Sequence, residues 1–113
     1  MSEPIVSHVP DRSCFEVVVD GRRAGLAQYV EQNGQRIFVH TEVGEEYEGR
    51  GLAGVLVDRA LDQTRAAGLR VVPACPYVKG FVDRHEQYAD LADPVTPAAR
   101  EIARAHEAAR GQR

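Results

Sequence analysis

The sequence is poor in cysteine, with Cys14 and Cys75 as the only two thiols among 113 residues. Two cysteines are too few for a disulfide framework or for a four-cysteine zinc site. The histidines and carboxylates also show no spacing typical of metal ligands. We therefore expect two free thiols, each of which needs its own explanation, and no bound metal.

Long apolar runs and clustered positive charge are lacking as well. No apolar run approaches the roughly 20 residues that span a bilayer, and residues 1–10 lack the apolar core of a signal peptide. The formal net charge is −3. The arginines are scattered among carboxylates, whereas a nucleic-acid binder usually presents a basic face. We therefore expect a cytoplasmic protein that binds neither membranes nor nucleic acids.

What remains is an ordinary globular composition, with 43% hydrophobic and 27% charged residues. A chain of this length forms one small domain with a single core. The pattern predicts this domain over residues 1–93 and a helical tail over residues 94–113. Thr96 and Pro97 suit the start of the tail helix. Ile102 is its only large apolar residue, so we expect the helix to fray or to dock weakly.

The first half of the chain predicts an antiparallel three-stranded meander. Asp20-Gly21 and Asn33-Gly34 are strong hairpin turn signals between the strands. Residues 1–12 form either a loose lead-in or a short edge strand. Strands are expected over three ranges rich in β-branched residues, namely residues 14–20, 23–30 and 35–43.

Side chains of a strand alternate between its two faces, and this alternation assigns faces to the second and third strands. One face of the second strand carries Ala24, Leu26, Gln28 and Val30. One face of the third strand carries Ile37, Val39, Thr41 and Val43, and the other carries Phe38, His40 and Glu42.

The second half of the chain predicts helices around one further strand. A helical period begins at Leu52 and ends at Gly68, which suits a C-terminal cap. A short apolar strand follows over residues 69–74. The strand–helix–strand order predicts a right-handed crossover, so this strand should run parallel to the third strand. A short helix is expected over residues 78–85 and a closing segment over residues 88–91.

The most informative stretch is the glycine turn between the third strand and the first helix, Glu48-Gly49-Arg50-Gly51-Leu52-Ala53. Unpaired N–H groups and the positive dipole end at a helix start bind anions, and glycine lets a phosphate approach the backbone. The alternative is a turn that needs glycine for its shape only. The turn lacks the Gly-Lys-Ser/Thr ending of a P-loop, and a dinucleotide-binding fold would not begin with an antiparallel meander.

This order of elements and this turn resemble the GNAT acetyltransferases. Their motif Arg/Gln-x-x-Gly-x-Gly/Ala matches Glu48-x-x-Gly51-x-Ala53, although Glu48 departs from the first position. The resemblance implies an α+β (α/β) GNAT-like fold, in which the meander precedes a β-α-β unit and one or two C-terminal helices. It also implies acetyl-CoA as co-substrate, bound by Val43 before the turn and by the backbone amides of Gly49, Arg50, Gly51, Leu52, Ala53 and Gly54.

A closer resemblance, over about residues 12–92, is to a short subfamily of GNAT-like proteins of the YjdJ type. This subfamily carries a glutamate where the wider family has Arg/Gln, so Glu48 matches it. The shared motifs occur in the same order and are His40-Thr41-Glu42-Val43, Glu48-Gly49-Arg50-Gly51, Val71-Val72-Pro73-Ala74-Cys75-Pro76-Tyr77 and His85-Glu86-Gln87-Tyr88-Ala89-Asp90-Leu91.

Four residues are candidates for the transfer chemistry. Cys75 lies at a strand end where, in the GNAT fold, the pantetheine arm enters; it is either a nucleophile that accepts the acetyl group or a small buried hydrophobe. The tyrosine that many GNAT enzymes use as an acid is missing from its place on the following helix, which leaves Tyr77 and Cys75 as the nearest alternatives. His40 and Glu42 are candidates for a base or an orienting residue, or are ordinary strand residues.

The sequence therefore favours an acetyl-CoA-dependent N-acetyltransferase with an unspecified amine acceptor. The alternative is an acyl-CoA-binding module with little or no transferase activity, because the usual acid is missing and the chain is short. A third possibility is an interaction domain that uses the C-terminal helix as its contact. We expect a monomer or a weak dimer.

Overall fold

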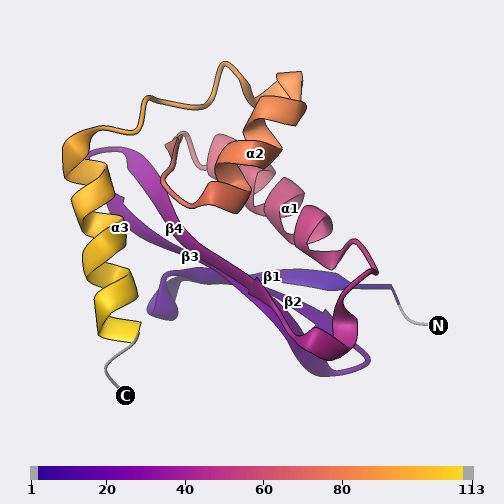
Figure 1. Ribbon diagram of the computed structural model, residues 1–113. Helices are drawn as coiled ribbons and strands as arrows, with labels where there is room; N and C mark the ends of the chain where they lie inside the picture. The colour runs from indigo at the N-terminus through magenta and orange to yellow at the C-terminus, as the bar shows by residue number, and fades with distance from the viewer. Residues whose placement is uncertain (1–2, 111–113) are drawn as a thin grey trace.

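The computed structural model describes residues 3–110, and residues 111–113 of the predicted tail lie outside this range. The described residues fold into a five-stranded mixed sheet and three α-helices (Figure 1). The strands lie in chain order across the sheet; the first four pair antiparallel, and the fifth runs parallel to the fourth. This confirms the α+β class, the meander and the parallel last strand. The strands are β1 Ile5–Val9, β2 Cys14–Val19, β3 Arg22–Gln32, β4 Gln35–Val43 and β5 Arg70–Pro73.

Both predicted hairpin turns are present. Asp20 and Gly21 have φ values of 52° and 80°, and Asn33 and Gly34 have values of 52° and 75°. Two successive residues with positive φ make a hairpin turn whose twist matches that of the flanking strands. The lead-in is the edge strand β1, which pairs with β2, so the antiparallel part has four strands rather than three.

Helices and short 3-10 turns connect and flank the strands. Gly68 follows α1 with a φ of 75°, as a C-terminal cap requires. Thr96 Oγ1 accepts the N–H of Ala99 at 3.1 Å, which confirms the predicted cap of α3. Within the described residues, no helix combines the length and the apolar character needed to cross a membrane. The helices are α1 Leu52–Ala66, α2 Pro76–Arg84 and α3 Pro97–Arg110, and the 3-10 turns are η1 Pro10–Arg12, η2 Glu45–Tyr47 and η3 Glu86–Tyr88.

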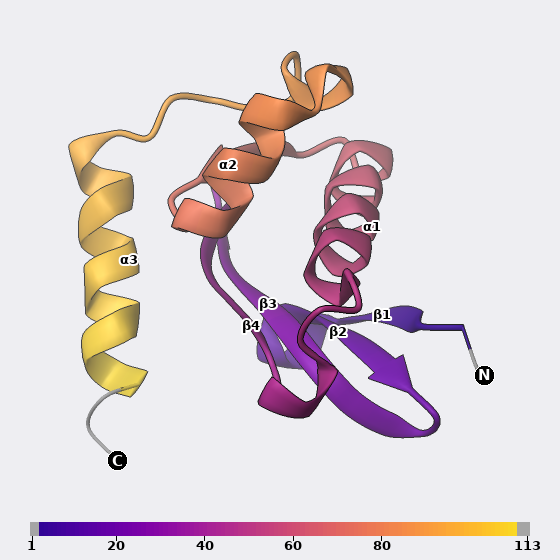
Figure 2. The same cartoon turned by 45° about the vertical axis from the view of Figure 1, so that its right-hand side comes forward.

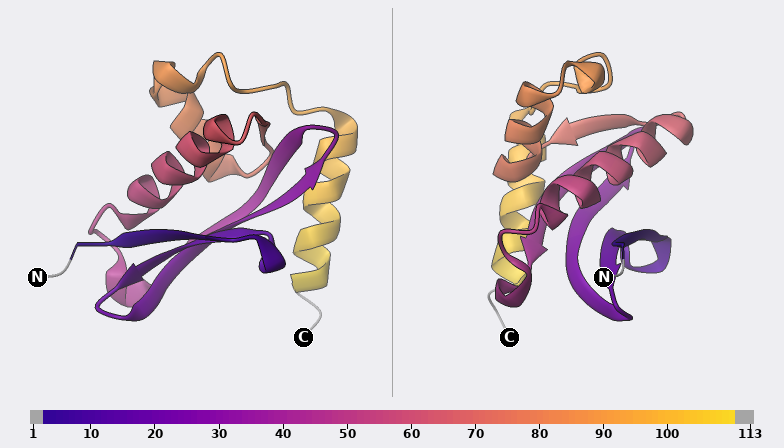
Figure 3. Two further views of the ribbon diagram at one scale, coloured as in Figure 1. Left: turned by 180° about the vertical axis from the view of Figure 1, so that it is seen from behind. Right: turned by 90° about the vertical axis from the view of Figure 1, so that its right-hand side faces the viewer.

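The helices cover both faces of a strongly twisted sheet (Figures 2 and 3). α1 and α2 lie on one face, where they close the main core around fully buried side chains such as Phe15, Phe38 and Leu56. α3 lies on the other face against β4, after an extended segment that Figure 2 shows clearly. The buried residues of this smaller cluster are Ile37, Val39, Val72 and Ala99.

β4 contains a β-bulge at Val39. Gln28 pairs with His40 and Tyr29 pairs with Phe38, so Val39 is an extra residue with no partner in β3. A bulge interrupts the alternation of side chains and re-aims the residues that follow it. The part of β4 after Val39 therefore presents the opposite set of side chains to each face.

This bulge corrects the predicted faces of β4. The prediction that Thr41 and Val43 share a face with Ile37 and Val39 is wrong, because it assumed uninterrupted alternation. The side chains on the main-core face are Phe38, Thr41 and Val43. Those on the α3 face are Ile37, Val39, His40 and Glu42.

A second irregularity corrects one face of β3. Ala24 is an extra residue between the pairs that β2 makes with Gly25 and Arg23. Ala24 packs in the main core, whereas Gln28 and Val30 face α3. The predicted common face of these residues is therefore wrong at Ala24.

α3 docks on the sheet through a small apolar patch and several polar contacts. Ala99 is its one buried residue. His106 Nε2 lies 2.9 Å from Gln28 Oε1, and Arg110 donates to Glu42 Oε1 at 2.7 Å. Polar contacts therefore supplement an apolar contact that is small, as the sequence of the helix predicts.

Candidate functional site

The glycine turn, the end of β4 and Tyr77 enclose a cavity of about 240 Å³. Glu48 and Tyr47 also line it, but Arg50 does not; its guanidinium lies 5.5 Å from the centre of the Tyr47 ring. The structure thus brings Tyr77 together with most of the residues predicted to bind a coenzyme. Those that line the cavity are Val43, Gly49, Gly51, Leu52, Ala53 and Gly54.

The backbone of the turn suits an anion. Gly49 and Gly51 have φ values of 85° and 72°, which residues with a Cβ rarely adopt. Gly51 is the N-cap of α1 and offers no side chain to the helix end. The first backbone bond of the helix is donated by Val55 to the Gly51 carbonyl at 3.3 Å. The N–H groups that precede Val55 have no intrahelical acceptor, so they can bind an anion in the cavity.

The charges around the turn partly oppose one another. The first turn of α1 has no acidic side chain, which leaves the positive end of the helix dipole uncompensated. Glu48 nevertheless lines the cavity, and its exposed carboxylate disfavours an anion. Backbone amides rather than a cationic side chain must therefore supply the attraction.

Gly54, in the first turn of α1, faces two aromatic side chains of α2. A Cβ at this position would stand 3.8 Å from the Tyr77 hydroxyl and 4.0 Å from the Phe81 ring. Tyr77 therefore reaches across to the first turn of α1, and its hydroxyl stands at the cavity wall. It is the one hydroxyl-bearing aromatic residue among the four predicted transfer candidates.

Cys75 marks the point where β5 leaves β4. The parallel ladder ends at the pair Phe38 and Pro73, and the Cys75 N–H then donates to the Phe38 carbonyl at 2.8 Å. Cys75 is the N-cap of α2 and is 5% exposed. Its Sγ lies 3.5 Å from Thr41 Oγ1. The thiol is therefore held at the fork between the two strands, on the main-core side.

Thr41 is the neighbour of Cys75 that sequence reasoning missed. The motif His40-Thr41-Glu42-Val43 drew attention to its histidine and glutamate, which share a strand face. The bulge at Val39 turns Thr41 toward the thiol instead. Uninterrupted alternation places Thr41 on the other face, so the sequence held no signal for this contact.

His40 and Glu42 lie together, but on the α3 face of β4. His40 Nε2 is 2.7 Å from Glu42 Oε1, and His40 Nδ1 is 3.9 Å from a Glu107 carboxylate oxygen. The hydrogen bond from His40, assisted by the nearby Arg110 charge, lowers the pKa of the Glu42 carboxyl. The predicted pair exists, but the sheet separates it from the thiol of Cys75.

A second cavity, of about 270 Å³, lies on the α3 side of the same fork. Its floor includes Val39, Ala74 and Pro76, and α3 forms its outer wall. Ala74 and Pro76 thus line this cavity, while Tyr77 lines the cavity at the glycine turn. The segment 74–77, with Cys75 in its middle, divides two cavities on opposite sides of the sheet.

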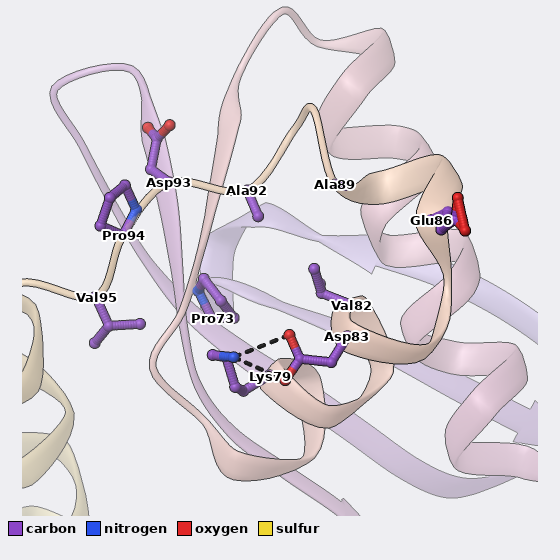
Figure 4. Close-up of a pocket in the computed structure, with 10 residues that line it drawn as sticks. All are labelled: Pro73, Lys79, Val82, Asp83, Glu86, Ala89, Ala92, Asp93, Pro94 and Val95. Atoms are coloured by element: carbon purple, nitrogen blue, oxygen red, sulfur yellow. Dashed lines mark hydrogen bonds and ion pairs between the residues drawn. The ribbon is translucent and has the colours of Figure 1, made fainter.

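A larger cavity, of about 420 Å³, lies elsewhere, between α2 and the segment that leads to α3 (Figure 4). Asp83, Glu86 and Asp93 line it, and the one lysine, Lys79, is paired with Asp83 at 2.7 Å. The excess of carboxylates disfavours an anionic coenzyme there. Among residues 3–110, no three histidine, cysteine or carboxylate side chains are grouped to hold a metal ion.

Comparison with known proteins agrees with this geometry. The family model described as GCN5-related N-acetyl-transferase matches residues 14–91, from β2 to just past η3. The chain belongs to this family. Its members generally use acetyl-CoA as co-substrate together with an acceptor. The matched range includes both walls of the fork and the glycine turn but not α3.

Two curated relatives share about a third of their residues with the chain. Protein NATD1 of Bos taurus is 34% identical over 93 residues, which cover 79% of this chain and 82% of the relative. Protein NATD1 of Mus musculus is 32% identical over 93 residues, which cover 79% of this chain and 84% of that protein.

Solved structures of the family share the fold. The solution structure of a GCN5-like N-acetyltransferase candidate from Staphylococcus aureus has a TM-score of 0.64 at 18% identity, and covers 86% of this chain and 95% of its own. The ribosomal-protein-S18-alanine N-acetyltransferase from Escherichia coli has a TM-score of 0.53 at 14% identity, over 63% of this chain and 49% of its own. These likenesses support the mixed sheet and the α1 crossover.

Proposed function

We propose that this protein is an acetyl-CoA-dependent N-acetyltransferase of the short subfamily that its motifs resemble. The observation that carries the proposal is the cavity at the glycine turn. It joins the free backbone N–H groups at the start of α1 to Tyr77, two residues from the thiol at the strand fork. Membership of an acetyltransferase family supports the same reading.

In this proposal the turn holds the coenzyme by its pyrophosphate. The amides from Gly49 to Gly54 donate to the phosphate oxygens, which the dipole of α1 also attracts. Val43 and Tyr77 form the walls along which the pantetheine arm leads toward the fork. Acetyl-CoA then supplies the acetyl group as a thioester.

The transfer residues divide between the two sides of the fork. On the coenzyme side, the Cys75 thiol is positioned by Thr41, and the Tyr77 hydroxyl can give a proton to a leaving thiolate. On the α3 side, His40 and Glu42 can take the proton of an approaching amine. The thiol either accepts the acetyl group first or packs beside a direct transfer.

The experiment is a calorimetric titration of the protein and of Gly51→Val with acetyl-CoA. The valine side chain blocks the close approach of the pyrophosphate and strains a left-handed residue, so binding should be lost while circular dichroism shows a folded chain. Gly34→Val is the matched control, because Gly34 has a similar φ of 75° in a hairpin turn away from the cavity. Unchanged affinity in Gly51→Val would contradict the assignment.

Mass spectrometry after mixing with acetyl-CoA separates the two transfer routes. An acetyl group on Cys75 indicates a route through an acyl-enzyme, and Cys75→Ala should then bind coenzyme without turnover. Cys14 is the internal control, because burial, with the nearby Glu16 charge, raises the pKa of its thiol and keeps it unreactive. Acetylation of both cysteines alike would contradict a specific role for Cys75.

A further inference from the structure

The cavity on the α3 side lies where an acceptor would have to approach. Ala74 and Pro76 line it beside the fork, and Tyr77 of the same segment lines the coenzyme cavity on the opposite face of the sheet. Beyond the pair Phe38 and Pro73 the strands β4 and β5 no longer form a ladder, so an acceptor on the α3 side can approach a thioester at this point. The outer wall of the cavity is α3, which lies beyond the residues 14–91 that the family model matches.

One side of α3 contacts the sheet, and the adjacent side lines the cavity. Ala99, His106 and Arg110 contact the sheet. Arg100 and Arg104, which stand one turn apart, line the cavity instead. The helix therefore anchors itself with one side and presents two guanidiniums to the cavity with the neighbouring side.

These two guanidiniums are available to a ligand. Among residues 3–110, the Arg100 side chain has no hydrogen-bond or ion-pair partner. Arg104 donates to Glu101 at 2.9 Å, but both side chains are about 70% exposed, at 70% and 72%. An exposed pair of this kind contributes little, so Arg104 can exchange Glu101 for an anionic group at small cost.

The other end of the cavity carries the opposite charge. Glu107 lines it one turn beyond Arg104, and lies 3.9 Å from His40, which in turn contacts Glu42 at 2.7 Å. A carboxylate beside an imidazole attracts an ammonium group and can take its proton. The cavity thus offers cationic groups at one end and a proton acceptor at the other.

We propose that α3 forms the acceptor pocket and that Arg100 and Arg104 select a small amine that also carries an anionic group, a carboxylate or a phosphate. This inference rests on the proposed function. Guanidinium groups bind both anions with two donors each. A volume of about 270 Å³ is enough to hold a small amine such as an amino acid.

Protons and bonds are conserved in the transfer that these groups would support. The bound ammonium loses one proton through the His40–Glu42 pair to water, and the neutral nitrogen forms a bond to the thioester carbon. The carbon–sulfur bond breaks, and the second proton of the nitrogen ends on the released thiolate. The products are the N-acetylated acid and the free thiol of the coenzyme.

The test compares pairs of amines that differ only in the anionic group. Lysine is paired with cadaverine, and phosphoethanolamine is paired with ethanolamine, each at saturating acetyl-CoA. Binding is followed by NMR titration of the ¹⁵N-labelled full-length protein, and KM is measured in parallel. We expect the acid-bearing member of one pair to bind about ten-fold or more tightly and to shift amide signals of α3. The pair that discriminates identifies carboxylate or phosphate as the anion.

Variants of the arginines test which residues select the acid-bearing amine. Arg100→Gln/Arg104→Gln should remove that advantage while leaving the neutral amine and acetyl-CoA unaffected. Arg59→Gln, an exposed arginine on α1, should behave as the unaltered protein. Equal affinity for acidic and neutral amines, or an advantage that survives in the double variant, would overturn the proposal. The proposed function is tested separately, by the loss of acetyl-CoA binding in Gly51→Val. If that loss is observed while the acceptor proposal fails, the proposed function stands, so the two failures are distinguishable.

Discussion

The two faces of the sheet are held in different ways. On the face of α1 and α2, a continuous apolar core joins side chains from all five strands. Leu56 and Leu61 of α1 are fully buried in it. On the face of α3, Ala99 is the one buried helix residue, and ion pairs and hydrogen bonds complete the contact. The first face resembles an ordinary protein interior, and the second resembles a transient interface.

This difference separates the parts that maintain the fold from those that can vary. Apolar burial stabilises by roughly 25 cal/mol per Å², whereas exposed ion pairs contribute at most about 1 kcal/mol each. The glycine turn and Cys75 belong to the well-packed face. The proposed acceptor pocket belongs to the other face, so the acceptor preference can change without loss of the coenzyme site.

The sharpest test of the comparison is to truncate one large aliphatic side chain to alanine on each face of the sheet. Leu56→Ala leaves a cavity in the main core and should lower the free energy of unfolding by about 2–5 kcal/mol. Ile102→Ala, on the half-buried side of α3, should cost less than about 1.5 kcal/mol. Urea denaturation of both variants measures the difference. Equal losses would show that the two faces contribute alike.

Tyr88→Phe tests a polar contact on the well-packed face. The Tyr88 hydroxyl lies 2.6 Å from Asp58 Oδ1 and 2.9 Å from Asp62 Oδ1, and links η3 to α1. The hydroxyl has one proton to donate, and its removal leaves the half-buried Asp58 carboxylate without that donor, so we expect a loss of about 1–3 kcal/mol in urea denaturation. Tyr47→Phe, in the exposed turn before α1, is the control and should cost little. A silent Tyr88→Phe would mean that apolar packing alone joins η3 to α1.

Acidification should weaken the α3 face. Burial, with the charges of Arg110 and His40, holds the pKa of His106 below its ordinary value of about 6.5. The unfolded chain therefore binds more protons just below that pH, and stability falls as the pH drops through 6.5. The lowered pKa of Glu42 adds a second loss below about pH 4.5.

The measurement is the free energy of unfolding at pH 7.5 and 5.5, which should be lower at pH 5.5 because His106 takes up a proton more readily in the unfolded chain. His106→Gln removes the titrating group and keeps an amide donor, so its stability should depend less on pH over this range. The same pH dependence in the variant would assign the effect to another residue.

The smallest effect is expected from the ion pair of Arg110. Arg110→Gln removes the contact with Glu42 at 2.7 Å and should cost about 0.2–1 kcal/mol, because both side chains are partly exposed. Glu101→Gln breaks the more exposed contact with Arg104 and should cost nothing measurable. Thermal unfolding at low and high salt checks both, and the Arg110 effect should shrink with salt. A loss above about 2 kcal/mol would place Arg110 in a buried network instead.

Local chemistry explains why much of the fold was predictable. Asn33-Gly34 and Asp20-Gly21 specify hairpin turns, because few other residues accept two successive positive φ values. The glycine turn was recognisable for the same reason: its two left-handed residues, Gly49 and Gly51, can scarcely be anything else. The parallel β5 followed from the crossover rule.

What could not be predicted depends on contacts between distant segments. A bulge at Val39 adds a single residue and leaves no compositional mark, so the reversal of Thr41 and His40 was invisible. The docking of α3 relies on partners 68 and 78 residues away, Glu42 and Gln28. Such pairs are determined by the assembled sheet rather than by the spacing of residues along the chain.

The bulge at Val39 determines which side chains of β4 face each side of the sheet. Before this residue, even-numbered side chains face the main core; after it, odd-numbered ones do. Loss of Val39 would make Phe38 and His40 adjacent and restore unbroken alternation, so Thr41 and Val43 would still face the main core and His40 and Glu42 would still face α3. β4 can therefore lose one residue at this point and still present Thr41 to the Cys75 thiol and His40 to α3.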